Sequence, residues 1–207
     1  MKRALLAFAG TVGLMLTEAS AFAAPEWFTI RSIVHAGTGC PAGTVAENIS
    51  PDRQAFTILF DSFLAEAGPG IPLSASRKNC QLNIAFDCPA GWRYSLVSLD
   101  TRGFAALDHG VTGVQQTTFY FQGQPNQGSV SRTFYGPLVE DYHQRDLVHV
   151  SSRPYGQCGR TARSLNINTS VRVDNLRNRG GSGLLTADSL DGSMIQTYGI
   201  VWERESL

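Results

Sequence analysis

The chain has 207 residues with 17 basic and 17 acidic side chains, so its formal charge at pH 7 is zero. This balance argues against a nucleic-acid partner or an anionic membrane, because either would need a basic patch. The length is sufficient for one domain with a hydrophobic core of its own.

The chain begins with the pattern of a secretory signal peptide. Lys2 and Arg3 form a short positive region, and the apolar run over residues 4–16 is too short to span a bilayer. Ala21 and Ala23 supply the small residues that precede a cleavage site. We therefore expect a signal peptide over residues 1–23, a single domain over residues 24–207 and no membrane span after cleavage. The mature protein should be secreted, or periplasmic if its source is a Gram-negative bacterium.

Period-two alternation of apolar and polar side chains recurs along the mature chain, with turns rich in glycine and proline between the runs. It predicts strands over residues 27–34, 44–49, 55–60, 79–87, 92–100, 104–107, 114–122, 129–135, 147–152, 164–173 and 194–202. One short helix is expected over residues 60–68, between an aspartate start and a glycine stop, and a long loop over residues 175–192. About ten short strands are typical of an antiparallel β-sandwich with jelly-roll or Greek-key connections.

Four cysteines in an exported chain predict two disulfides, and the lack of any C-x-x-C pair disfavours zinc. Cys80 and Cys88 end the alternating stretch "CQLNIAFDC", and eight residue steps in one strand would separate their Cα atoms by about 26 Å. A disulfide needs Cα atoms within about 7 Å, so these two cannot pair. Two connectivities stay open: Cys40–Cys80 with Cys88–Cys158, or Cys40–Cys88 with Cys80–Cys158.

Several segments resemble the secreted-protein family called domain of unknown function 4360. They are "GTGCPAGTV" (37–45), "RKNCQLNIAF" (77–86), "PAGWRYSLVSLDTRGFAALD" (89–108), "FYFQG" (119–123) and "CGRTARSLNINTSVRV" (158–173). The resemblance extends over about residues 33–202 and implies a small exported β-sandwich, with no catalytic residues to carry over. It also implies a Cys40–Cys80 bond, since these cysteines look like the family's shared pair, with Cys88–Cys158 as the second bond.

The densest polar cluster is "VEDYHQRDLVHV", in which Glu140 and Asp141 stand close to two histidines. On an extended strand Asp141 and His143 share a face, but His149 would lie about 20 Å further along unless a turn intervenes near residues 144–146. An extracellular hydrolase or a metal-dependent enzyme that uses this cluster is therefore the competing hypothesis. No nucleophile motif or carboxylate pair stands out, so we assign no catalytic residue, cofactor or metal.

Two tyrosines suggest a binding surface. Tyr120 alternates with Phe119 and Phe121, and Tyr135 follows Phe134, so both tyrosines should point away from the core. Outward tyrosines on neighbouring strands would form a platform on which a sugar or a peptide could stack, although tyrosines that simply cap the rim of a core are the ordinary alternative. We expect a non-catalytic extracellular binding or structural module with a glycan or protein ligand, and with Tyr120 and Tyr135 as contacts.

Overall fold

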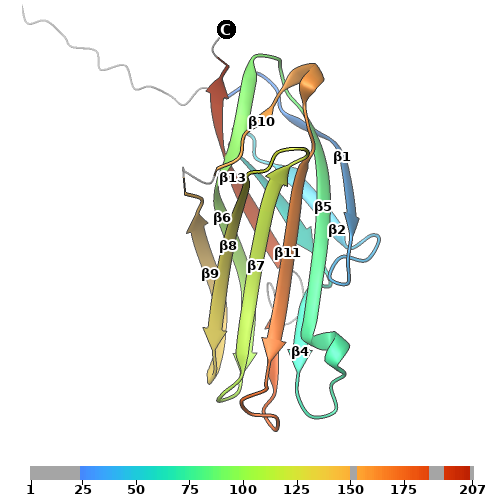
Figure 1. Cartoon of the computed structure of the whole chain (residues 1–207), viewed down its shortest axis with the longest axis vertical. Helices are drawn as coiled ribbons and strands as arrows, with labels where there is room; N and C mark the ends of the chain where they lie inside the picture. The colour runs from blue at the N-terminus through green and yellow to red at the C-terminus, as the bar shows by residue number, and fades with distance from the viewer. Residues whose placement is uncertain (1–23, 150–152, 187–193, 206–207) are drawn as a thin grey trace, which may run out of the picture.

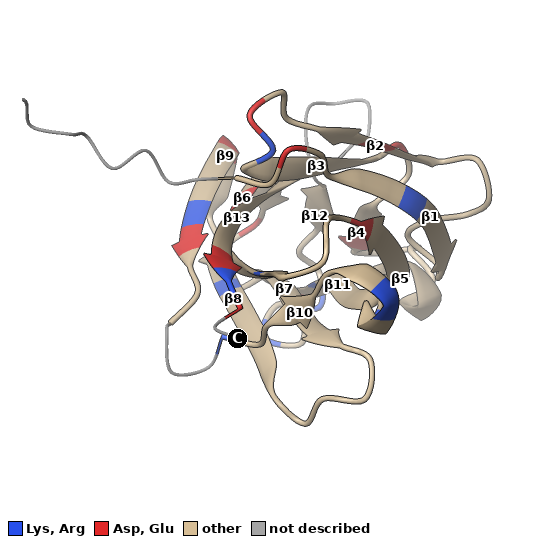
Figure 2. Ribbon diagram, turned by 90° about the horizontal axis from the view of Figure 1, so that it is seen from above, with Lys and Arg blue, Asp and Glu red and all other residues tan. Residues whose placement is uncertain are grey.

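Two antiparallel sheets face each other across a common core (Figures 1 and 2). The computed structural model describes residues 24–149, 153–186 and 194–205, so the expected signal peptide over residues 1–23 lies outside the described residues. Within the described ranges, no helix has the length and hydropathy needed to cross a membrane.

The first sheet has five strands, and every neighbouring pair is antiparallel. Their order is β1 (Thr29–Ala36), β5 (Arg77–Asp87), β11 (Leu165–Asp174), β7 (Thr112–Phe121) and β8 (Gln127–Tyr135). Because strands distant in sequence lie side by side, the chain crosses repeatedly between the two sheets.

The second sheet has eight strands, and β6 is its central element. The main order is β2 (Val45–Ile49), β3 (Ala55–Phe60), β13 (Met194–Arg204), β6 (Trp92–Leu107), β12 (Gly183–Thr186) and β4 (Leu64–Ala67). Both β9 (Leu138–Leu147) and β10 (Gly156–Gln157) also pair with β6, and the short 3₁₀ turns η1 (Leu73–Ser76) and η3 (Gly159–Thr161) lie outside the sheets. The predicted antiparallel β-sandwich is confirmed.

The expected helix over residues 60–68 is wrong, because part of that segment is strand β4. Ala65 and Ala67 turn into the core on alternate positions, and β4 pairs with β12. The aspartate start and glycine stop therefore flank a strand that is stabilised by pairing with a distant segment.

Three further expectations need correction. The strands expected over residues 92–100 and 104–107 are one continuous strand, β6. Of the segment expected as a strand over residues 147–152, Leu147 is the last residue of β9, Val148 and His149 are not in a strand, and residues 150–152 lie outside the described ranges. The loop expected over residues 175–192 contains β12. No strand was expected over residues 138–146, where β9 lies. Strand β9 carries mostly exposed polar side chains, so it lacks the alternation of apolar and polar residues from which strands were predicted.

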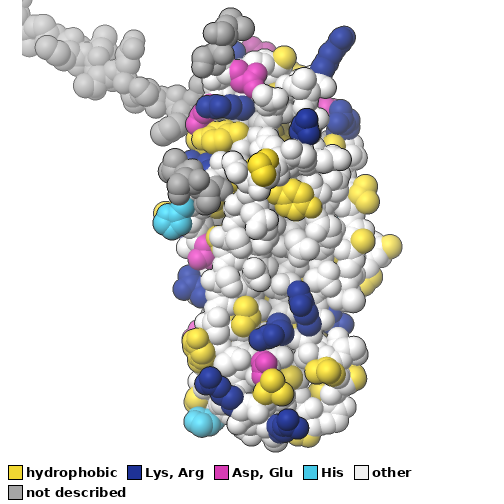
Figure 3. Space-filling view, in the orientation of Figure 1, with side chains coloured by type: hydrophobic (Ala, Val, Ile, Leu, Met, Phe, Trp, Pro, Cys, Tyr) yellow, Lys and Arg dark blue, Asp and Glu magenta, His cyan; other side chains and the backbone are white. Residues whose placement is uncertain are grey.

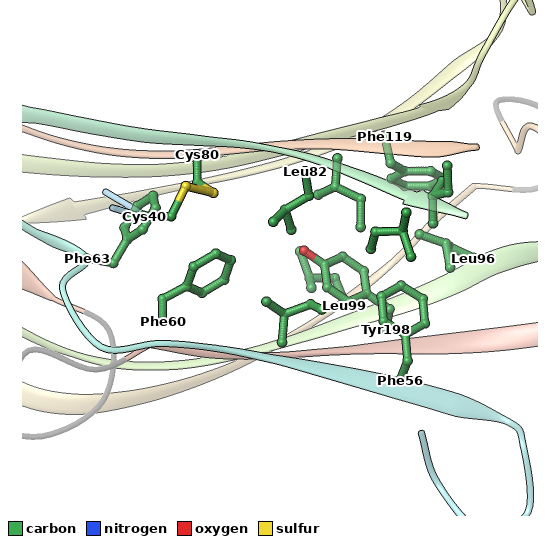
Figure 4. Close-up of a cluster of buried hydrophobic side chains, with 14 of the residues drawn as sticks. Cys40, Phe56, Phe60, Phe63, Cys80, Leu82, Leu96, Leu99, Phe119 and Tyr198 are labelled. Carbon is green, nitrogen blue, oxygen red and sulfur yellow. A yellow bond between two sulfur atoms is a disulfide. The ribbon is translucent and has the colours of Figure 1, made fainter. Parts of the chain in front are cut away.

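The inner face of β5 is formed by the apolar side chains of the alternating stretch. Cys80, Leu82, Ile84 and Phe86 are at most 2% exposed. Figure 4 shows Cys80 and Leu82 pointing toward side chains of the second sheet, and the Phe86 ring packs against Phe56 and Tyr94 of that sheet. The structure pairs Cys40 with Cys80 and Cys88 with Cys158, with Cα–Cα distances of 5.5 and 5.2 Å. Cys80 lies near the start of the unbroken strand β5 and Cys88 directly follows its last residue, so the two cysteines are far apart and bind different partners.

A buried polar cluster joins the two sheets in the middle of this core. Gln196 of β13 donates hydrogen bonds to Thr117 of β7 at 3.0 Å and to Thr169 of β11 at 3.2 Å. Its side-chain oxygen accepts a hydrogen bond from the Tyr198 hydroxyl at 2.7 Å. The bonds require one particular alignment of β13 against β7 and β11, so the cluster specifies how the sheets face each other.

Candidate functional site

The outer face of the first sheet carries uncharged polar side chains over its middle. The strand register places them in three rows that run across β5, β11, β7 and β8. We call this surface the amide face. Its rows are Asn83, Asn166, Tyr120 and Gln127; Gln81, Asn168, Thr118 and Ser129; and Asn79, Ser170, Gln116 and Ser131.

Hydrogen bonds within the rows orient the amide groups. Asn83 Nδ2 donates to Asn166 Oδ1 at 3.0 Å, and Asn168 Nδ2 donates to Gln81 Oε1 at 2.9 Å. Each primary amide has two donor hydrogens and two acceptor lone pairs, so one such bond leaves groups available to a ligand. Neighbouring rows thus present both donors and acceptors from side chains whose positions are already restrained.

Charged side chains stand at the two ends of the amide face. Arg77 and Arg172 lie opposite each other in the β5–β11 register at one end, and Arg31 forms an ion pair with Asp87 at 3.1 Å at the other. Figure 3 shows the result as a largely white band across the middle, with dark-blue side chains above and below it. Any ligand on this band meets no formal charge.

Tyr120 belongs to the amide face, whereas Tyr135 does not. Tyr120 lies between Asn166 and Gln127 and is partly exposed. Tyr135 pairs with Thr112, eight residue steps further along β7, which is about 26 Å. The structure therefore does not bring the two tyrosines together in one platform, although the phenylalanines next to them point inward as expected.

The polar cluster of residues 140–149 is spread along an extended strand. Strand β9 continues to Leu147 without the turn that would be needed to bring His149 back to Asp141 and His143. His143 instead lies 3.5 Å from Asp100 of β6, and Asp146 forms an ion pair with Arg132 of β8 at 3.1 Å. In the described ranges, no three His, Cys, Asp or Glu side chains are grouped so as to hold a metal ion.

A shallow hollow of about 380 Å³ lies beside this strand. His143, Arg145, Asp100 and Arg102 line it. Arg145 lies 4.0 Å from the same Asp100 oxygen that faces His143, so the carboxylate lies between a guanidinium group and an imidazole ring. Both flanking side chains are more than half exposed, which is typical of a solvated ion pair rather than an activated catalytic group.

The shifted pKa values belong to groups that hold the fold together. Burial raises the pKa of Tyr94, Tyr142 and Tyr198, which lie inside the sandwich. The hydrogen bond from Tyr155 lowers the pKa of the Glu203 carboxyl, which also binds Arg93. These shifts mark structural interactions and give no support to the enzyme hypothesis.

The amide face was not predicted from the sequence, because the prediction considered only the side chains that each strand points toward the core. The alternate side chains, which point to the outer face, also carried a signal. In the segment from Asn79 to Asn83 and in that from Asn166 to Ser170, every second residue is an uncharged amide or hydroxyl side chain. The signal was present in each strand, but only the register shows that the strands align into rows.

The fold and this face define a disulfide-bonded β-sandwich with a neutral polar surface on one sheet. The chain belongs to the family called domain of unknown function 4360, whose family model matches residues 26–204. An uncharacterized secreted protein of Arthroderma benhamiae is 41% identical over 180 residues, which span 87% of this chain and 73% of that relative. This relative confirms that the protein is secreted.

Two solved structures show distant likeness. The carbohydrate-binding module TmCBM61 in complex with β-1,4-galactotriose has a TM-score of 0.27 and 14% identity, over 84% of this chain and 90% of that chain. The enzymatically active domain of bacteriophage CBA120 tailspike protein 4 has a TM-score of 0.26 and 15% identity, over 86% of this chain and 19% of that chain. Scores this low carry no argument about ligand or activity.

Proposed function

We propose that the protein is a non-catalytic module that binds an uncharged extracellular polysaccharide through the amide face. The observation that supports this most is the set of three aligned rows of amide and hydroxyl side chains with no charge among them. Sugar hydroxyls both donate and accept hydrogen bonds, as do these side chains. A charged side chain at the centre of the face would lose hydration without gaining an ionic partner on a neutral sugar.

Tyr120 supplies the apolar contact of the proposed site. Its ring lies in the first row, flanked by the amides of Asn166 and Gln127, so a pyranose could stack on the ring while its hydroxyls reach these amides. Tyr135 is too far away to contact the same few sugar units. We therefore assign Tyr120 to the polysaccharide site and leave Tyr135 outside it.

Retention on insoluble polysaccharides tests the proposal. The mature protein should be retained on at least one neutral polysaccharide among cellulose, chitin and β-1,3-glucan. Tyr120→Ala should weaken its affinity about tenfold, because a stacked aromatic contributes on the order of 1 kcal/mol or more. Tyr135→Ala is the matched control, a tyrosine on the neighbouring strand, and should be retained like the wild type.

A second variant tests the neutrality of the face. Asn168→Arg introduces a charge in the middle row without changing the core, since this side chain is exposed. It should lower retention on the same polysaccharide. Failure of the wild-type protein to bind every neutral polysaccharide, or equal retention of the wild type, Tyr120→Ala and Asn168→Arg, would contradict the proposed function.

A further inference from the structure

Exposed apolar side chains gather at one end of the sandwich, the lower end in Figure 1. Among the described residues, eight large apolar side chains are exposed, and five of them lie at this end. We call them the apolar end: Ile71, Leu73, Tyr135, Val139 and Leu176. Figure 3 shows yellow patches here among dark-blue side chains. This concentration is unusual for a soluble surface, where single apolar side chains are scattered.

Ile71, Leu73 and Leu176 stand on connections between strands, whereas Tyr135 and Val139 lie at the ends of β8 and β9, and hollows separate some of these side chains. Leu73 of η1 is 87% exposed and Leu176, in the β11–β12 connection, is 69% exposed. These two leucines line the same hollow of about 260 Å³, and Ile71 lines both this hollow and a second one of about 340 Å³ beside Val139. The result is a set of projecting tips rather than a flat patch.

Arginines surround these tips. Arg77, Arg177 and Arg179 are exposed, and none of them forms an ion pair with another described residue. Arg172, which lines the first hollow, lies 3.7 Å from Asp174.

Two of the nearby carboxylates are engaged by the backbone of the loops. Asp174 accepts a hydrogen bond from the Leu176 amide at 2.9 Å, and Asp108 accepts one from the Ser182 amide at 2.8 Å. Glu66 lines both hollows and is the third carboxylate there. Arg77, Arg177 and Arg179 therefore have no carboxylate partner among the described residues, although the formal charge of the whole chain is zero.

We propose that the apolar end docks on the surface of a lipid bilayer that contains anionic lipids. Leu73 and Leu176 would enter the interfacial region, and the arginines would lie at the level of the lipid headgroups, where each basic side chain near an anionic surface is attracted to it. Tyr135 suits the same depth, because its ring is apolar and its hydroxyl is polar. A fluid bilayer fills the hollows between separate tips without needing a complementary shape, which favours it over a folded partner.

This docking would leave the amide face accessible. The rows of the amide face lie along the side of the sandwich, and Arg77 and Arg172 separate them from the apolar end. The two surfaces therefore use different residues, and each can be tested while the other is intact.

Co-sedimentation with vesicles tests the proposal. The mature protein should sediment with vesicles that contain phosphatidylcholine and phosphatidylglycerol, and much less with phosphatidylcholine alone. Leu73→Ser combined with Leu176→Ser should weaken binding about tenfold or more, because two exposed leucines no longer enter the interface. Leu147→Ser is the matched control, an exposed leucine at the opposite end of β9, and should bind like the wild type.

A second pair of substitutions tests how much the arginines contribute to vesicle binding. Arg177→Gln combined with Arg179→Gln should weaken binding to the anionic vesicles about tenfold, and raising the salt concentration should do the same by screening. Tyr120→Ala should bind vesicles normally. The proposal is overturned if the wild type binds neither kind of vesicle or if the leucine pair and Leu147→Ser behave alike. A concentration-dependent dimer that the leucine pair abolishes, without vesicle binding, would also overturn it and assign this end to self-association.

Discussion

Tyr120 and Tyr135 both point away from the core of the first sheet, but only Tyr120 lies on the amide face. Both point outward, and this follows from their alternation with buried phenylalanines. Their separation follows from the register of the β7–β8 pair: Tyr120 lies beside the connecting turn and Tyr135 at the far end of its strand. Direction is a local property with a period of two, whereas proximity depends on where the chain turns.

Gln196 is another residue whose role was invisible in the sequence. A glutamine in a strand is ordinarily expected at the surface, yet this side chain is fully buried between the sheets. Its partners Thr117 and Thr169 come from segments far away in the chain, so no local pattern could have identified them.

Replacing Gln196 tests the importance of the buried polar cluster. Gln196→Ala should lower the free energy of unfolding by about 3 kcal/mol, because it leaves a cavity and removes the hydrogen-bond partner of the Tyr198 hydroxyl. Urea unfolding followed by tryptophan fluorescence measures the change. Gln116→Ala, at an exposed position on β7, is the control and should shift stability by less than about 0.5 kcal/mol. Equal effects of the two substitutions would refute the structural role of Gln196.

At the scale of elements, strand β5 was predicted best. Its strict alternation of apolar and polar side chains gave both its extent and its buried face, and its continuity excluded a Cys80–Cys88 bond. The pairing itself came from family resemblance, since spacing left two connectivities open. Strands β4 and β12 are only four residues each, too short for a periodic signal, and were missed.

Removal of each disulfide tests how the ends of β5 are held. The double substitutions Cys40→Ala with Cys80→Ala and Cys88→Ala with Cys158→Ala should each lower the free energy of unfolding by about 3–4 kcal/mol, because they release long loops in the unfolded chain. Denaturant unfolding under non-reducing conditions measures this. Dithiothreitol should destabilise each variant less than the wild type, since one bond is already absent. A loss below about 1 kcal/mol in both variants would contradict this role.

For the whole molecule, the alternation of side chains predicted the β-sandwich, the N-terminal signal pattern predicted secretion, and four cysteines in an exported chain predicted two disulfides. They did not predict the amide face or the apolar end, because each combines residues from several distant segments. The amide face needs the register of four strands, and the apolar end needs three connections to meet at one end of the sandwich. Formal charge is a sum over the whole chain, so it does not show how neutral and charged side chains are distributed over the surface.

The most direct test of the central claim is to map where a sugar chain binds. A soluble neutral oligosaccharide, prepared from a polysaccharide that retains the protein, should be titrated into the mature protein and followed by backbone amide chemical shifts. We predict that the largest changes cluster on the amide face, around Asn83, Asn166 and Tyr120, and leave the apolar end and the His143 hollow unchanged. Changes centred on Asp100 and His143, or on the apolar end, would contradict the account.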